Sequence, residues 1–215
     1  MRLAFTAICI CVYSATAQQV HRVPFESRDN VVELAVRNTS SISAQRVSVE
    51  VLQAPAWLTF SSSVFELDDL GPQEMQPVEF AFSVDNTAPV DQRQTVTFVV
   101  SSSSGEQWRK EISIAVDPPR EYRLFDTYPN PFNPSTTVEF ELPEHSYVTL
   151  RAYDLLGREV ALIVEGELAP GHHRRTWNAA GLASGVYVIV LHAEIAGSRN
   201  RDRVVRLEQK VLLTK

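Results

Sequence analysis

The chain has 215 residues, of which 44% are apolar and 21% charged, so it is long and apolar enough for one or two folded domains and is not a disordered chain. Positions 18–119 hold seven Lys or Arg against fourteen Asp or Glu, and positions 120–215 hold twelve of each. Neither half has the basic excess that nucleic-acid binding requires, so we expect no nucleic-acid partner.

The first 17 residues have the pattern of a secretory signal peptide. A positive start at Met1-Arg2 precedes an uncharged apolar run over positions 3–12, and Ala15-Thr16-Ala17 forms a small-x-small cleavage site. We therefore predict cleavage between Ala17 and Gln18. A buried strand or a membrane anchor is the alternative, but the run is too short to cross a bilayer and no later segment is apolar enough, so we expect no membrane span.

Both cysteines, Cys9 and Cys11, lie inside the predicted signal peptide. Neither follows a lipoprotein-type pattern, which argues against a lipid anchor. The mature chain would then hold no cysteine, and so no disulfide, thiol nucleophile or thiolate metal site. We expect no cofactor and no metal.

The segment 18–117 reads as short β-strands. Apolar residues alternate with polar ones, which is typical of strands with one buried and one wet face. The alternating runs lie at positions 32–36, 47–51, 78–84, 96–100 and 112–116. Turn residues separate them, and no helical periodicity occurs. The pattern predicts an antiparallel β-sandwich. The order of its pieces resembles the immunoglobulin-like sandwiches that accompany bacterial secreted and cell-surface proteins, although the Cys–Trp–Cys core of true immunoglobulin domains is missing.

A proline-rich linker over 118–121 follows. Pro118-Pro119 cannot donate to a sheet and stiffens the chain. We place the domain boundary here, with a second domain over 122–215. That domain is again predicted to be a β-sandwich, which makes the chain all-β with two sandwiches in tandem. A tight turn at 154–158 has Gly157 for a positive φ, and the apolar run 185–195 indicates a central, covered strand.

The second domain also contains a distinctive ordered series of motifs. The series runs Tyr128-Pro129-Asn130-Pro131-Phe132-Asn133-Pro134-Ser135-Thr136, Tyr153-Asp154-Leu155-Leu156-Gly157-Arg158-Glu159-Val160, Pro170-Gly171-His172-His173, Trp177-Asn178 and Leu182-Ala183-Ser184-Gly185-Val186-Tyr187, and it closes with Lys210-Val211-Leu212-Leu213-Thr214-Lys215. In order and spacing, residues 122–215 closely resemble the type A C-terminal sorting domain of the type IX secretion system. A flagellar-hook-cap-type sandwich shares this pattern, but the signal peptide and the terminal position favour sorting.

This resemblance implies an export route and its partners. The signal peptide would take the chain into the periplasm of a diderm bacterium, and an outer-membrane translocon would then recognise the folded C-terminal domain. A surface sortase would remove that domain and either attach the rest to lipopolysaccharide or release it. The sorting-motif residues that we single out are Tyr128, Pro129, Asn130, Pro131, Phe132, Asn133, Pro134, Gly157, Gly171, Gly185, Tyr187, Lys210 and Lys215.

The proline segment has a simple physical interpretation. Pro129, Pro131 and Pro134 fix φ and remove three amide donors, so the segment cannot be an interior strand. We expect Tyr128 and Phe132 to pin it to the sandwich, and its two asparagines to bond local backbone groups. Gly157, Gly171 and Gly185 are expected at turns.

Candidate chemistry is sparse. His172 and His173 are adjacent on a predicted strand, so they point to opposite faces and cannot share a metal. No serine lies in a Gly-x-Ser-x-Gly turn. Trp57 is expected to be buried and Trp108 to be more exposed, and core or edge packing is favoured over sugar stacking for both.

We therefore predict a secreted or cell-surface protein that is not an enzyme and is exported through its C-terminal sorting domain. The alternative is a carbohydrate- or matrix-binding surface adhesin, which an exposed row of aromatic side chains would favour. A hydrolase is the third option and would need a cleft with paired carboxylates or a triad.

Overall fold

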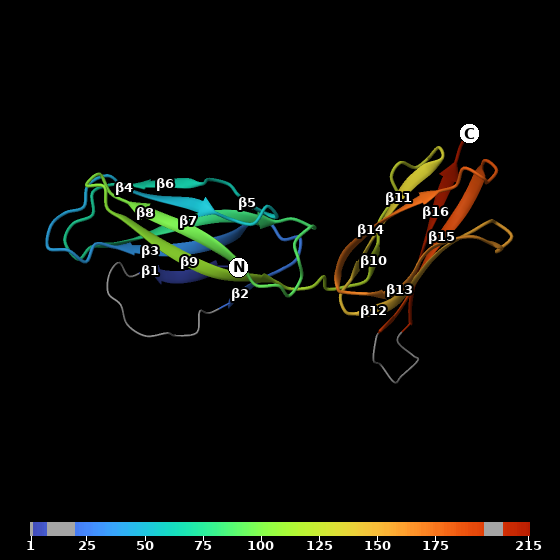
Figure 1. Cartoon of the computed structure of the whole chain (residues 1–215), viewed down its shortest axis with the longest axis horizontal. Helices are drawn as coiled ribbons and strands as arrows, with labels where there is room; N and C mark the ends of the chain where they lie inside the picture. The colour runs from blue at the N-terminus through green and yellow to red at the C-terminus, as the bar shows by residue number, and fades with distance from the viewer. Residues whose placement is uncertain (1, 8–19, 196–203) are drawn as a thin grey trace. The chain divides into compact units, whose positions relative to one another are not determined.

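The structure, a computed structural model, describes residues 2–7, 20–195 and 204–215, and all sixteen elements in them are β-strands (Figure 1). The chain divides into two compact units, Met1–Asp117 (unit 1) and Pro118–Lys215 (unit 2), which meet at the double proline. The predicted signal cleavage after Ala17 lies outside the described residues. No helix in the described part of the chain is long and apolar enough to cross a membrane.

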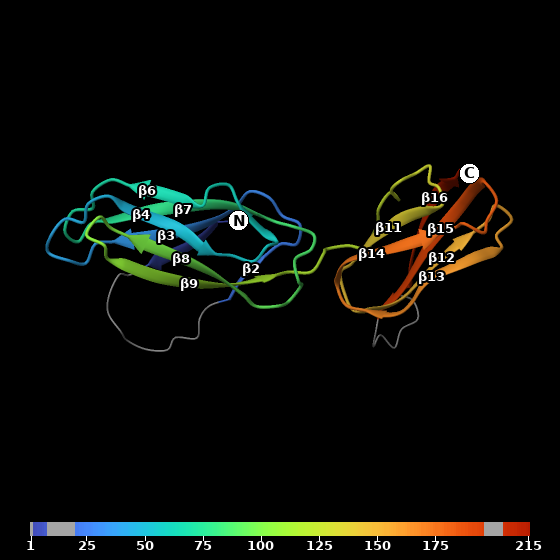
Figure 2. The ribbon, with the colours of Figure 1, turned by 45° about the horizontal axis from the view of Figure 1, so that its top comes forward.

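Unit 1 is a sandwich of a four-stranded and a five-stranded sheet (Figure 2). In spatial order, the first consists of β1 (Arg2–Ala7), β3 (Asn30–Arg37), β7 (Met75–Val84) and β5 (Leu58–Phe60). The second consists of β2 (Val20–Val23), β9 (Gln107–Val116), β8 (Gln94–Ser101), β4 (Val47–Gln53) and β6 (Val64–Leu67). From β1 to β8 each connection crosses from one sheet to the other, as in immunoglobulin-like folds, and β8 and β9 are neighbours in one sheet.

The predicted alternation forms the core of unit 1. Val78, Phe80, Phe82 and Val84 of β7 are all at most 3% exposed, whereas Glu79 between them points to solvent. Phe80 packs against the ring of Phe98 on the opposite sheet, with centroids 5.3 Å apart. Because one face of each sheet is apolar, stacking the two faces removes both from water.

The start of the chain lies at the edge of a sheet of unit 1. Arg2–Ala7 forms β1, which pairs in parallel with β3 from Val31 to Val36. Residues 2–7 of the predicted signal peptide therefore form an edge strand in the uncleaved chain. The outer edge of β3 offers unpaired backbone groups, and an extended apolar segment can satisfy them.

Unit 2 is a second sandwich, of a three-stranded and a four-stranded sheet. The first consists of β10 (Arg123–Leu124), β11 (Ser135–Leu142) and β14 (Gly171–Asn178), and the second of β13 (Glu159–Leu168), β12 (Ser146–Tyr153), β15 (Gly185–Ile195) and β16 (Val204–Leu213). As predicted, β15 is central, between β12 and β16. The core of unit 2 includes Phe132, Leu150, Ile189 and Leu213, each at most 1% exposed.

The predicted fold class is confirmed: the chain is all-β and forms two immunoglobulin-like sandwiches. One detail is corrected, because the sheets are not purely antiparallel. β1 pairs with β3 and β2 pairs with β9 in parallel. Both of these pairs lie at sheet edges, where a strand can be added without a hairpin.

Candidate functional site

The proline segment 128–134 is held against the end of β16. Phe132 donates its amide to the Leu212 carbonyl (2.9 Å) and accepts from the Thr214 amide (3.0 Å). At its start, Tyr128 exchanges two backbone hydrogen bonds with Thr137 on β11. The backbone of the segment meets the sheets at isolated bridges and not in a continuous strand ladder, as expected for a chain with three prolines.

Asn130 reinforces the same attachment. The Leu212 amide donates to its Oδ1 at 2.9 Å, and its Nδ2 donates to the Lys210 carbonyl at 3.3 Å. We expected local bonds for this asparagine, and that expectation is wrong, because its partners are about 80 residues away in the sequence. The Asn130 side chain thus satisfies backbone groups on the edge of β16 that a proline, which has no amide hydrogen, could not fully pair.

The two aromatic residues of the segment behave differently. Phe132 is 1% exposed and packs on Trp177, which in turn meets Tyr187, with centroids 5.3 and 5.8 Å apart. The Tyr187 hydroxyl donates to the Ala183 carbonyl at 2.7 Å. Tyr128, however, is 80% exposed. We expected the rings of both residues to pin the segment, and for Tyr128 this is wrong: of the two rings only that of Phe132 is buried in the sandwich, and that of Tyr128 lies in solvent.

The turn between β12 and β13 is organised by Asp154. Its carboxylate accepts from the amides of Leu156 and Arg158 and from the Arg158 guanidinium. The hydrogen bond from the Arg158 amide, followed by that from its side chain, holds the pKa of Asp154 below its ordinary value. Gly157 has φ of 76°, the positive value that we predicted. The turn leaves Leu155 and Leu156 projecting into water.

These loops meet at one end of unit 2. The Ala179 amide donates to the Pro134 carbonyl, and the Lys215 amide donates to the Ser184 hydroxyl, so the loop 179–184 lies beside both the proline segment and the chain end. Pairing of Tyr153 with Val188 brings the Asp154 turn to the same end of its sheet. We call residues 128–134 and 179–184, together with Leu155 and Leu156, the tip surface.

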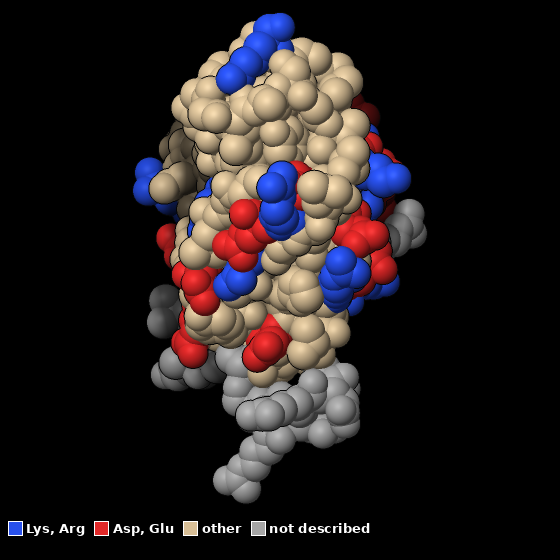
Figure 3. All heavy atoms as spheres, turned by 90° about the vertical axis from the view of Figure 1, so that its right-hand side faces the viewer, with Lys and Arg blue, Asp and Glu red and all other residues tan. Residues whose placement is uncertain are grey.

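The two segments of the tip surface contain no charged residue, and Asp154 and Arg158 flank its two leucines. Positions 127–138 and 176–193 contain no Asp, Glu, Lys or Arg. Tyr128, Leu155 and Leu156 are 80%, 71% and 79% exposed. Figure 3, which faces this end of unit 2, shows a broad area free of charged side chains. Exposed apolar groups gathered without charges are typical of a contact surface for another protein.

The remaining sorting-motif residues lie in strands and in the proline segment, and Gly171 and Gly185, which we expected in turns, are strand residues. Gly171 and Gly185 begin β14 and β15, and Lys210 is exposed on β16. Pro129, Pro131, Asn133 and Pro134 are exposed in the proline segment. The structure brings all of them except Gly171 to the tip end of unit 2, because Gly171 pairs with Leu142 at the opposite end of β11.

The adjacent histidines point to opposite faces of β14, as predicted. His172 lies 3.4 Å from Glu139 and 3.8 Å from the buried Glu141. His173 stacks on Phe140 and bonds to the Ala169 carbonyl at 2.8 Å. Burial lowers the pKa of the His173 imidazole. Among the described residues, no group of three or more His, Cys, Asp or Glu is arranged to hold a metal ion.

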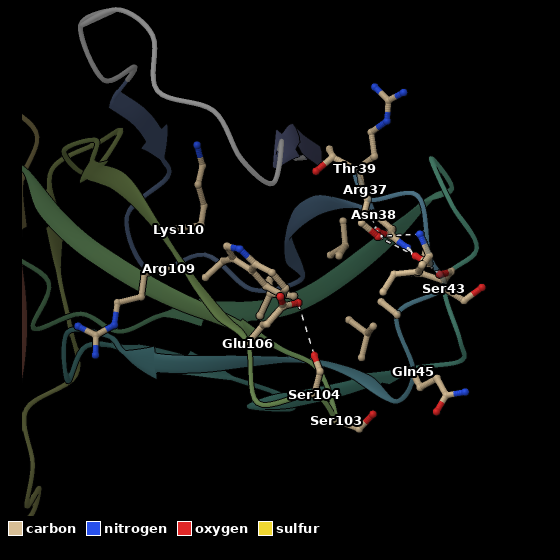
Figure 4. Close-up of a pocket in the computed structure, with 18 residues that line it drawn as sticks. Arg37, Asn38, Thr39, Ser43, Gln45, Ser103, Ser104, Glu106, Arg109 and Lys110 are labelled. Carbon is tan, nitrogen blue, oxygen red and sulfur yellow. Dashed lines mark hydrogen bonds between the residues drawn. The ribbon is translucent and has the colours of Figure 1, made fainter.

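Unit 1 has a cavity of about 460 Å³ at the end of its sandwich (Figure 4). Its floor is apolar and includes Val36, Val47, Leu70 and Val100, and its rim is formed by the 38–45 loop and the 103–106 hairpin. Trp108 lines it, partly buried against the core. Trp57, in contrast, is 7% exposed and belongs to the core, as expected. Sequence patterns did not reveal the cavity, because its walls come from three separate segments, 36–47, Leu70 and 100–110.

Comparison with known proteins identifies unit 2. Residues 126–204 match the family model of the secretion system C-terminal sorting domain. The chain therefore carries a type IX secretion sorting domain, as predicted. It is a protein of a diderm bacterium that is secreted by this system or displayed on the cell surface. The sorting domain implies interaction with the type IX machinery.

Solved structures are similar to the chain at low identity. They include the CupB2 chaperone of Pseudomonas aeruginosa (12% identity, 89% of this chain and 96% of that one, TM-score 0.31). Dimeric latent PorU of Porphyromonas gingivalis is similar at 12% identity over 93% of this chain and 19% of that one, with TM-score 0.33. CopC of Methylosinus trichosporium OB3b is similar at 20% identity, over 43% and 93%, with TM-score 0.30. No curated protein sequence matches the chain.

Proposed function

We propose that the protein is a non-catalytic surface module whose unit 1 binds a ligand and whose unit 2 is read by the export machinery through the tip surface. Recognition of unit 2 is supported by the combination of exposed side chains and fixed loops at the tip surface. Tyr128, Leu155 and Leu156 are exposed, while Phe132 and Asn130 fix the proline segment and Asp154 organises the turn that carries the two leucines. A receptor can bind such a preformed surface without the entropic cost of ordering it.

The fate of the two units after export follows from the linker. Unit 2 would be removed near Pro118-Pro119 by a surface sortase, and unit 1 would be attached to lipopolysaccharide or released. The two units separate at Asp117, so a cut there leaves each sandwich with its own core. The signal peptide over 1–17 would bring the chain to the periplasm beforehand.

A binding role for unit 1 fits its cavity better than catalysis does. Glu106 is the one carboxylate among the described residues that line the cavity, and no histidine lines it. Glycoside hydrolysis needs two carboxyl groups facing one substrate. The row of exposed aromatic side chains that would favour carbohydrate binding is not formed by the two tryptophans of unit 1, since Trp57 is in the core.

Export of matched leucine variants tests the tip surface. Leu156 is 79% exposed at the tip, and Leu162 is 50% exposed in the middle of β13. Each change to Ala should alter the stability of unit 2 by less than about 0.5 kcal/mol. Leu156→Ala combined with Tyr128→Ala should lower secretion about tenfold or more, as truncation of central contact residues does, whereas Leu162→Ala should not.

The readout is fractionation of the native host followed by mass spectrometry of the mature protein. A chain ending at Asp117 should stay in the periplasm, and peptides from the secreted full chain should begin at Gln18 and end near the linker. Equal secretion of the full and shortened chains would contradict a sorting role for unit 2. Normal secretion of the Tyr128 and Leu156 double variant would contradict the tip surface alone.

A further inference from the structure

Two side chains that line the cavity of unit 1, those of Trp108 and Lys110, come from the inner face of β9. Trp108 and Lys110 lie on the same face of β9 as the buried Ile112 and Ile114, so they project between the sheets. β2 pairs with β9 only from Ser113 to Val116, and in the described part of the chain no strand pairs with the preceding half of β9 on that side. The cavity therefore opens where the sandwich lacks an edge strand.

The charge around this opening is opposite to that of unit 1 as a whole. The lining includes Arg37, Arg109 and Lys110 against the single carboxylate of Glu106, although positions 18–119 hold twice as many acidic as basic residues. Lys110 makes no ion pair with any described residue. Figure 4 shows Lys110 and Arg109 leaving β9 on opposite sides, and of the two Lys110 is the partly buried one, on the face of β9 that Ile112 and Ile114 share.

The polar groups of the rim are largely used within the protein. Asn38 donates to the carbonyls of Ile42 (2.8 Å) and Leu70 (3.0 Å), and the Ser40 hydroxyl donates to the Ile42 carbonyl (2.7 Å). A sugar needs several converging polar partners, and these residues are already engaged. The apolar floor, the Trp108 ring and the Lys110 ammonium remain available for a ligand.

We propose that the cavity binds a small amphipathic carboxylate, such as a medium-chain fatty acid. Its apolar chain would lie on Leu70, Val100 and the face of Trp108, and its carboxylate would pair with Lys110. About 460 Å³ falls within the ~300–1,000 Å³ of small-molecule sites. This inference rests on the proposal that unit 1 is a binding module, and it names the class of ligand.

Calorimetric titration of the purified chain, with both units present, tests this ligand class. The probes are dodecanoate, dodecanol and a maltose oligosaccharide, each below any micellar concentration. We expect saturable binding of dodecanoate. Lys110→Gln should weaken dodecanoate about tenfold, the effect of losing one charge-assisted contact, and leave dodecanol unchanged. Trp108→Ala should weaken both, and Arg93→Gln, an exposed cation of unit 1 away from the cavity, should weaken neither.

Three results would overturn the proposal: no saturable dodecanoate binding, equal loss of dodecanoate and dodecanol affinity in Lys110→Gln, or binding of the oligosaccharide alone. Thermal unfolding of each variant shows whether unit 1 is intact. Secretion of Lys110→Gln should be normal, because unit 2 is unchanged. Failure of the titration with normal secretion would thus refute the ligand while leaving the export role in place.

Discussion

The loops at the end of each sandwich are held by different sets of hydrogen bonds. In unit 2, Phe132 and Asn130 tie the proline segment to β16, which lies about 80 residues further along the chain, and the result is a firm convex surface. In unit 1, Asn38 and Ser40 bond mainly within their own loop and to Leu70, and a cavity remains between the sheets. In unit 2 the hydrogen bonds hold the proline segment against the end of a strand, whereas in unit 1 they join the rim loops to one another and leave a cavity between the sheets.

Core truncations provide the strongest test of this comparison. Phe132 and Phe80 are the matched pair, at 1% and 2% exposed. Each change to Ala should destabilise its own unit by about 3–5 kcal/mol, because a large buried ring leaves a cavity. Phe132→Ala should also abolish secretion, while Phe80→Ala should leave the tip surface intact. Calorimetry would resolve the two transitions, and a common shift of both would contradict independent units.

Two neighbouring leucines test whether β16 closes the core of unit 2. Leu213 is fully buried and Leu212 is 38% exposed. Leu213→Ala should destabilise unit 2 by about 2–5 kcal/mol and Leu212→Ala by less than about 0.5 kcal/mol. Chemical denaturation followed by tryptophan fluorescence measures both, since Trp177 lies in the core of unit 2. Equal effects would mean that β16 does not close this core.

The Asp154 turn predicts acid sensitivity that is confined to unit 2. Its pKa is lowered in the folded state, so its contribution is present above the unfolded pKa of about 3.9 and is lost as pH falls through the folded value. The thermal transition of unit 2 should be lower in Asp154→Asn than in wild type at neutral pH, and this gap should close in acid. Glu167→Gln, an exposed carboxylate on the same hairpin, should show no such gap.

The smallest expected effect concerns His173. Burial lowers its folded pKa, so the unfolded chain binds more protons just below about pH 6.5, and wild-type unit 2 should lose stability there as pH falls. His173→Gln should remove this part of the pH dependence. His145→Gln, at an exposed position in a turn, is the control and should keep it. Retention of the dependence in His173→Gln would assign it to another group.

The sequence predicted the strands well, because alternation directly reports which face of a strand is buried. It also predicted the positive φ of Gly157 and the burial of Trp57 and Phe132. It failed where the answer depends on partners distant in sequence. Tyr128 resembles Phe132 in its proline context, but pairing with Thr137 leaves its ring outside the sandwich.

The cavity of unit 1 could not be predicted for a related reason. Its opening depends on where β2 stops pairing with β9, which is a matter of register between strands about 90 residues apart. Sequence patterns identified Trp108 as a candidate but did not connect it with Lys110 or Leu70. Motif order identified the sorting domain because that information is carried by consecutive residues.

The tip surface of unit 2 depends on β16, which is the last strand of the domain. Val211 and Leu213 complete the core of unit 2, and the backbone groups of Leu212 and Thr214 hold Phe132 in place. A fragment that stops before Val211 lacks these contacts and cannot form the tip surface, however intact its first sandwich is. Under the proposed recognition of the tip surface, a chain that stops before Val211 would not be exported.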